Sequence, residues 1–296
     1  MKPKPFKYLK PHTLTDALEV LYEHGDDAKI LAGGQSLVPM MNFRIVNPTV
    51  VLDLNNIDGL DFVAIEQDDK QLKLGTLVRQ HTVENDCVLL GRWPIFGDTI
   101  SHIGHFQIRN RGTIGGSIAH FDPAAELPAL LIAMGGTLTL NNKRQKRIVQ
   151  ANDFFIGPFE TVIEPNEILT EINFSLMPET SGYSVVEISR QDGAFAMAGA
   201  ISIISTDSAG SFTDVGLILF GVSDVPYVCN NVVADLIGSC PSESDLREIA
   251  INSTKEIDYM SDIHASKELR RHLANVLAYR SLNEAYQRAL KNIKQI

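Results

Sequence analysis

Two short segments with paired glycines contain the residues of this sequence that best fit the binding of an anion. They are residues 32–36 (AGGQS) and 113–117 (TIGGS), and both end in serine. Glycine lets main-chain N–H groups approach an anion closely at positive φ, and a serine hydroxyl adds a donor. Neither segment has the lysine of a P-loop. The pair predicts a long ligand with two phosphates, whereas either segment alone is as typical of an ordinary tight turn.

Three histidines near the second segment are the other candidates for chemistry. His102, His105 and His120 have no spacing that gives a complete metal site, so we predict no metal ligand. We interpret His102 and His105 as structural or solvent-facing, and His120 as equally compatible with a cofactor contact. Because the sequence has no Ser/His/Asp signature of nucleophilic catalysis, we assign no catalytic residue.

Composition argues against several classes of function. The 296-residue chain has a formal net charge of −10, which is opposite to the basic surface that nucleic acids require. Cys87, Cys229 and Cys240 are too few and too widely spaced for a disulfide framework or an iron–sulfur cluster. Electron transfer would therefore need a bound cofactor such as a flavin. Because no apolar run approaches the roughly 18 residues of a spanning helix, we expect a cytoplasmic protein without a membrane span.

Hydrophobic patterning predicts an α+β chain with three regions. In the first region, residues 1–56, Thr13 begins a capped helix and strands follow at 28–32 and 48–54. The second region is residues 57–177. Its expected elements are a strand at 72–76, helices opening at 82–86, near 98–105 and at 124–134, a strand at 137–140 and a solvated basic hairpin turn at 143–147.

The third region, residues 178–296, changes from mixed elements to strands followed by helices. The expected antiparallel strands lie at 183–189, 198–205 and 215–222, and the expected helices at 242–252 and 264–293.

Residues 31–41 (LAGGQSLVPMM) and 107–129 (QIRNRGTIGGSIAHFDPAAELPA) resemble the medium, FAD-binding subunit of molybdenum hydroxylases, the carbon monoxide dehydrogenase and xanthine dehydrogenase family. The resemblance extends over essentially the whole chain. It implies a vanillyl-alcohol-oxidase-like (PCMH-type) fold, with two α/β FAD-binding subdomains and a C-terminal subdomain of a three-stranded antiparallel sheet and helices. It also implies bound FAD, a molybdopterin-binding large subunit that hydroxylates the substrate, and a small subunit with two [2Fe–2S] clusters. The expected assembly is a dimer of heterotrimers in which this chain passes electrons to an external acceptor.

The resemblance also implies which residues contact FAD. Glu126 stands where the family commonly has aspartate, and a charge in the first turn of a helix is its alternative interpretation. Phe195 could equally be a core phenylalanine, and Leu169 a buried strand leucine. The expected cofactor contacts are Leu31, Ala32, Gly33, Gly34, Gln35, Ser36 and Leu37 for the pyrophosphate and adenosine; Thr113, Ile114, Gly115, Gly116, Ser117, His120 and Glu126 for phosphate, ribose or ribityl groups; and Ile103, Phe195 and Leu169 near the flavin or adenine.

Two positions depart from the family pattern. Glu187 stands where some members have a lysine near the flavin, and Ala194 stands where some have an acidic residue. Both departures weaken the inference that NAD is the acceptor. Two other functions remain open from the sequence: a stand-alone FAD-dependent oxidase or dehydrogenase acting on a small organic substrate, and a cofactor-free interaction subunit.

Overall fold

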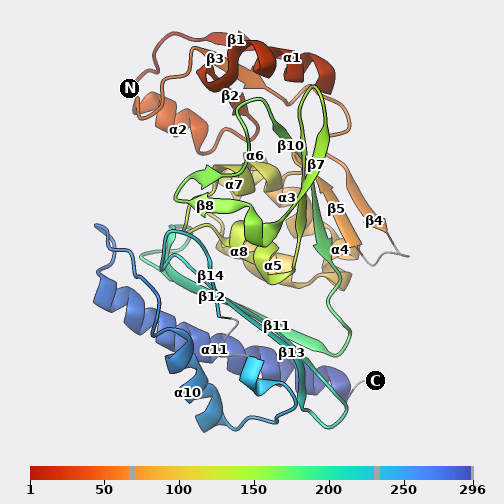
Figure 1. Cartoon of the computed structure of the whole chain (residues 1–296), viewed down its shortest axis with the longest axis vertical. Coiled ribbons are helices and arrows are strands. Elements are labelled where there is room, and N and C mark those ends of the chain that lie inside the picture. The colour runs from red at the N-terminus through yellow and green to blue at the C-terminus, as the bar shows by residue number, and fades with distance from the viewer. Residues whose placement is uncertain (67–70, 230–233, 295–296) are drawn as a thin grey trace.

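The computed structural model describes residues 1–66, 71–229 and 234–294, and it consists of three units stacked along the long axis of the molecule (Figure 1). Each unit is built around its own sheet, and the middle unit adds a small two-stranded sheet. The fold is mixed α and β, as the sequence predicts. Among the described residues, no helix has both the length and the apolar character needed to cross a membrane.

The first unit is a parallel three-stranded sheet with the strand order β1-β3-β2. It consists of β1 (Lys7–Leu9), α1 (Leu14–His24), β2 (Ala28–Leu31), α2 (Leu37–Asn42) and β3 (Val50–Asp53). Thr13 caps α1 by accepting a hydrogen bond from the N–H of Asp16, as expected for this residue type. The buried side of α1 packs on the sheet through Ala17, Leu18 and Leu21.

The middle unit combines an antiparallel five-stranded sheet, of order β4-β5-β10-β6-β7, with six short helices. The strands are β4 (Val63–Glu66), β5 (Gln71–Gly75), β6 (Thr137–Asn141), β7 (Lys146–Gln150) and β10 (Ile168–Ser175), with a separate hairpin of β8 (Phe155–Gly157) and β9 (Glu160–Thr161). The helices are α3 (Gln80–Asn85), α4 (Cys87–Arg92), α5 (Ile95–His102), α6 (Phe106–Arg111), α7 (Ile114–His120) and α8 (Glu126–Ala133).

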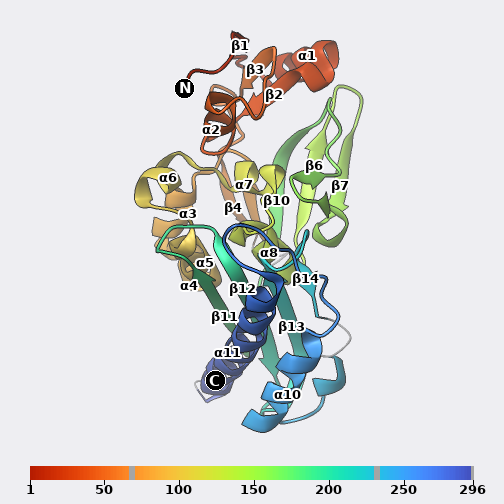
Figure 2. The same ribbon diagram turned by 90° about the vertical axis from the view of Figure 1, so that its left-hand side faces the viewer.

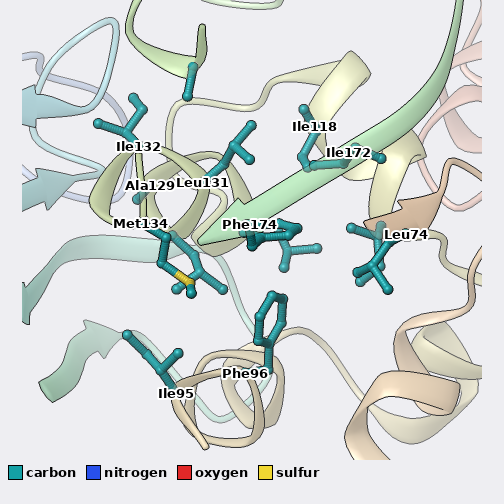
Figure 3. Packing of buried hydrophobic residues seen from close by; sticks show 14 of the residues in the cluster. Leu74, Ile95, Phe96, Ile118, Ala129, Leu131, Ile132, Met134, Ile172 and Phe174 are labelled. Carbon is teal, nitrogen blue, oxygen red and sulfur yellow. The ribbon is translucent and has the colours of Figure 1, made fainter. Parts of the chain in front are cut away.

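The largest hydrophobic core lies between this sheet and the helices (Figure 3). Phe96 of α5 meets Phe174 of β10 edge to face, with ring centroids 4.8 Å apart, a favourable aromatic geometry. Leu131 of α8 and Ile118 of α7 belong to the same cluster. This core fixes α5, α7 and α8 as a rigid support for the loops at their ends.

The third unit is an antiparallel sheet with α11 along one face (Figure 2). Its elements are β11 (Ser181–Ser189), β12 (Ala196–Thr206), β13 (Phe212–Phe220), β14 (Tyr227–Val228), α10 (Glu243–Ser253) and α11 (Lys267–Ile293). The three long strands confirm the expected sheet, and β14 adds a two-residue fourth strand. A Cβ on Gly182 would lie 2.0 Å from the carbonyl oxygen of Ala285, so glycine there permits the close approach of α11.

Most of the long predicted elements are present, with shifts at their ends. The helix expected near 98–105 spans residues 95–102, and the one expected to open at 82–86 begins at Gln80. The basic run forms the β6–β7 turn, closed by a hydrogen bond from the N–H of Asn142 to Gln145 O. Lys143 in this turn forms a 2.6 Å ion pair with Glu19 of α1, so the turn also contacts the first unit.

Candidate cofactor-binding site

The two glycine segments, about eighty residues apart in sequence, meet between the first and middle units. A Cβ built on Gly33 would lie 2.4 Å from the carbonyl oxygen of Arg111 and 2.9 Å from Cα of Gly112. A Cβ on Gly116 would lie 3.6 Å from Cβ of Ala32. The contact between the segments is therefore close enough that any side chain at position 33 would push them apart.

The first segment presents a row of unused main-chain donors. Residues 32–36 form the loop between β2 and α2, and Gly34 has a φ of 74°, which suits glycine. Within the described part of the chain, no group accepts a hydrogen bond from the N–H of residues 33 to 36. Successive main-chain N–H groups of a turn that have no acceptor in the protein can form a concavity that binds an anion. This loop therefore fits a phosphate group.

The second segment differs from the expected loop, because it is the first turn of α7. Thr113 is the N-cap, and its hydroxyl accepts a 2.9 Å hydrogen bond from the N–H of Gly116. The N–H groups of Ile114, Gly115 and Ser117 bind the carbonyl oxygens of Val78, Thr76 and Thr113, respectively. The amides of this segment are thus used within the protein. Ser117 Oγ has no hydrogen-bond partner among the described residues and is the donor that the segment can still offer.

Arg79, a residue that the sequence did not reveal as part of the site, ties the two segments together. It precedes α3, and its guanidinium donates to the carbonyl oxygen of Arg111 at 2.6 Å and to Asn55 Oδ1 at 2.5 Å. The side-chain amide of Asn55 donates to the carbonyl oxygen of Ala32 at 2.9 Å. Burial lowers the pKa of Arg79, and the nearby charge of Arg111 lowers it further. The Arg79 guanidinium therefore lies close to the first segment, and the charge of Arg111 is near it.

Asp53, at the end of β3, anchors the same network. It accepts hydrogen bonds from the hydroxyl of Tyr8 and from the main-chain N–H of Asn55. Burial alone would raise the pKa of Asp53, but these hydrogen bonds outweigh it and hold the pKa below its usual value. The carboxylate is therefore ionised near neutral pH and fixes the orientation of Asn55.

Ile103 and Phe195, two of the residues expected near the flavin, lie where the middle and third units meet. Ile103 follows α5, and Gly193 packs on the next residue, because a Cβ on Gly193 would lie 2.9 Å from the carbonyl oxygen of Gly104. Phe195 is 64% exposed, so it is not a core phenylalanine. Its exposed ring is available to cover a bound ring system.

Other expected contacts are buried to different degrees. Leu169 is 4% exposed and belongs to the main core, so only its main chain remains available. Glu126 begins α8 and is 5% exposed, and burial raises its pKa to about 7, with a contribution from the charge of Asp122. His120 is half-buried, with its ring centroid 5.2 Å from that of Phe159, and burial lowers its pKa.

Unused amides and Arg79 at the junction of the first and middle units, with the exposed ring of Phe195 where the middle and third units meet, are features that suit a phosphate-containing cofactor. Comparison with protein families identifies the class of cofactor-binding protein to which the chain belongs. The family described as "FAD binding domain in molybdopterin dehydrogenase" matches residues 4–176, and "CO dehydrogenase flavoprotein C-terminal domain" matches residues 183–285. The chain therefore belongs to the FAD-binding subunits of molybdopterin dehydrogenases.

Individual relatives are similar to this chain over nearly its whole length. The chain is 34% identical to the 6-hydroxypseudooxynicotine dehydrogenase complex subunit alpha of Paenarthrobacter nicotinovorans, covering 98% of this chain and 97% of the relative. It is 32% identical to the carbon monoxide dehydrogenase medium chain of Afipia carboxidovorans, covering 98% and 99%. The structure of quinoline 2-oxidoreductase from Pseudomonas putida 86 matches with a TM-score of 0.93 at 31% identity, covering 98% of this chain and all of that chain.

Proposed function

We propose that this chain is the FAD-binding electron-transfer subunit of a heteromeric molybdenum hydroxylase. It receives electrons from [2Fe–2S] clusters of a small subunit and passes them to an external acceptor, while a molybdopterin-binding large subunit oxidises the substrate. The observation that carries the proposal is the row of four unused amides near the Arg79 guanidinium. The similarity of the whole chain to dehydrogenase subunits supports it.

Each part of the site has a physical role in holding FAD. The amides of the first segment and the nearby arginines stabilise the negative charge of the pyrophosphate. Ser117 Oγ donates to a phosphate or ribityl oxygen, and Ile103 and Phe195 cover the ring and exclude water. Bound FAD supplies the ability to accept and release electrons. The proposed contacts are residues 31–37, Ile103, residues 113–117, His120, Glu126, Leu169 and Phe195.

The chain's own side chains support the need for redox partners. Cys229 is buried, whereas Cys87 and Cys240 are exposed. In the part of the chain that the structure describes, no group of three or more His, Cys, Asp or Glu residues is arranged to hold a metal. We propose that the clusters that supply the electrons belong to another subunit. We propose a dimer of heterotrimers, located in the cytoplasm, with region boundaries at residues 56/57 and 177/178.

Isolation of the native assembly tests this function. We expect the released cofactor to be FAD, and a molybdenum-containing subunit and a [2Fe–2S] subunit to copurify with the chain. Release of FMN, or of no flavin, would reject the FAD assignment. Rapid reduction of the isolated chain by a small organic substrate would instead support a stand-alone oxidase.

A further inference from the structure

Two buried carboxyl groups, those of Glu187 and Glu126, have no proton-transfer role in the function proposed above. Glu187 is on β11 and Glu126 begins α8. The Glu187 side chain is 4% exposed, and its Oε2 is buried without a hydrogen-bond partner in the described structure. An isolated buried carboxylate is costly, so such a group is more stable when it holds a proton.

The alternation of side chains along β11 shows toward which face of the sheet the Glu187 side chain is oriented. Tyr183 and Val185 pack in the core of the middle unit, whereas Val186 and Ile188 pack in the core under α11. Because alternate residues share a face, Glu187 faces the middle unit, where α5 and α8 lie. Glu187 therefore lies on the face of the sheet that packs against α5, the helix that Ile103 follows.

His102, at the end of α5, lies between Glu187 and the solvent. Its Nδ1 is 3.7 Å from Glu187 Oε1, and one third of its side chain is exposed. This distance is longer than a direct hydrogen bond, so proton transfer needs a ring rotation or a bridging water. Burial lowers the pKa of His102, which favours the neutral ring that can accept a proton on one nitrogen and release it from the other.

The surrounding charges do not neutralise the two carboxyl groups. Glu187 is paired with Gly199 on β12, which has no charge. On α5, Asp98 forms a 3.1 Å ion pair with Arg288 of α11, and Arg288 also binds Glu284. The neighbour of Glu126 is Asp122, another acid.

Both carboxyl groups therefore titrate near neutral pH, so the pair keeps an ionised fraction that can still take up a proton. Burial raises the pKa of Glu187 to about 8, and the charge of Glu126 adds to the shift. Because the two groups interact, each of the two observed protonation steps involves both glutamates and cannot be assigned to one of them.

We infer that Glu187 and Glu126 form a charge-compensating pair, which takes up a proton from water through His102 when electrons arrive at the neighbouring cofactor. The inference rests on the proposed FAD function. The electrons come from the partner's clusters and the proton comes from solvent, so one negative charge gained at the cofactor is matched by one proton gained by a carboxylate oxygen. No bond to the cofactor is required. The glutamate at position 187 thus makes the electron affinity of the site depend on pH.

An infrared pH titration of the purified protein tests the pair without requiring FAD. We expect a protonated carboxyl band that persists to neutral pH and disappears between about pH 6 and pH 9, well above the ordinary range for glutamate. This band should weaken in Glu187→Gln. Complete ionisation of all carboxyl groups in the wild-type protein by about pH 6 would overturn the inference. Absence of FAD would instead count against the proposed function and leave the infrared result valid.

Spectroelectrochemistry of the holoenzyme tests the coupling to electron transfer. Glu187→Gln should raise the flavin midpoint potential above about pH 8, where the wild-type pair is ionised and repels added electrons. Below about pH 6 the two potentials should agree, because both side chains are then neutral. Glu179→Gln, at an exposed site before β11, is the control. It should leave the flavin midpoint potential unchanged both above about pH 8 and below about pH 6. Equal potentials for Glu187→Gln and wild type at every pH would contradict the inference, and Glu126→Gln provides a second variant if the first does not fold.

Discussion

The segments at 32–36 and 113–117 are similar in sequence, but their main-chain amides have different partners. In the first, four N–H groups have no acceptor within the described chain, and Gly33 permits contact with Arg111. In the second, the N–H groups of residues 114–117 are hydrogen-bonded inside the protein, and Gly115 permits contact with Thr76. A glycine pair therefore does not itself identify an anion site. What matters is where the amide hydrogen bonds go.

The largest expected effect comes from Gly115→Ala, which tests the packing role of the second segment. Its Cβ would lie 1.9 Å from Thr76 Oγ1 and 2.7 Å from the main chain of Thr76, so side-chain rotation cannot relieve the clash. We expect the free energy of unfolding to fall by about 1–3 kcal/mol or more, with and without FAD. Gly91→Ala in α4, where a Cβ meets nothing within 4 Å, is the matched control. Chemical denaturation measures both, and equal stability of the two variants would show that Gly115 has no packing role.

Gly33→Ala should act mainly on FAD binding. The added Cβ would push the loop away from the carbonyl oxygen of Arg111, 2.4 Å away, and displace the unused amides. A cost of about 1–3 kcal/mol corresponds to a dissociation constant for FAD about 5- to 150-fold higher. Fluorescence titration of the cofactor-depleted protein measures this, again with Gly91→Ala as control. A folded variant with undiminished affinity would exclude the first segment from the pyrophosphate site.

Ser117→Ala should have the smallest effect, because it removes one hydroxyl without changing the packing of α7. We expect the free energy of FAD binding to weaken by about 0.5–1.5 kcal/mol, or roughly 2- to 10-fold in affinity. The stability of the cofactor-free protein should not change, since Ser117 Oγ has no partner in the described structure. If the affinity stays the same, the second segment contributes no side-chain donor, and the two segments differ more than we propose.

Local patterns in the sequence were sufficient for the elements that have strong local signals. The cap at Thr13, the alternating residues of β11 to β13 and the long amphipathic α11 all lie close to their predicted positions. By contrast, the glycine pair at 115–116 predicts an anion-binding loop, whereas residues 114–120 form α7, although glycine in a helix costs about 1 kcal/mol relative to alanine. Contacts with Thr76 and Val78 offset that cost in the folded protein. Similarly, α2 is only six residues long and contains Pro39, which its first turn tolerates.

The sequence by itself determined the family and the two glycine segments, because these depend on residues close together in the chain. Only the tertiary structure decided which amides remain unused, since their acceptors come from distant strands and turns. It also brought Arg79 and Asn55 to the proposed cofactor site and buried Glu187 beside His102. Neither arrangement has a local sequence signal, because burial and electrostatic environment depend on which elements pack against each other.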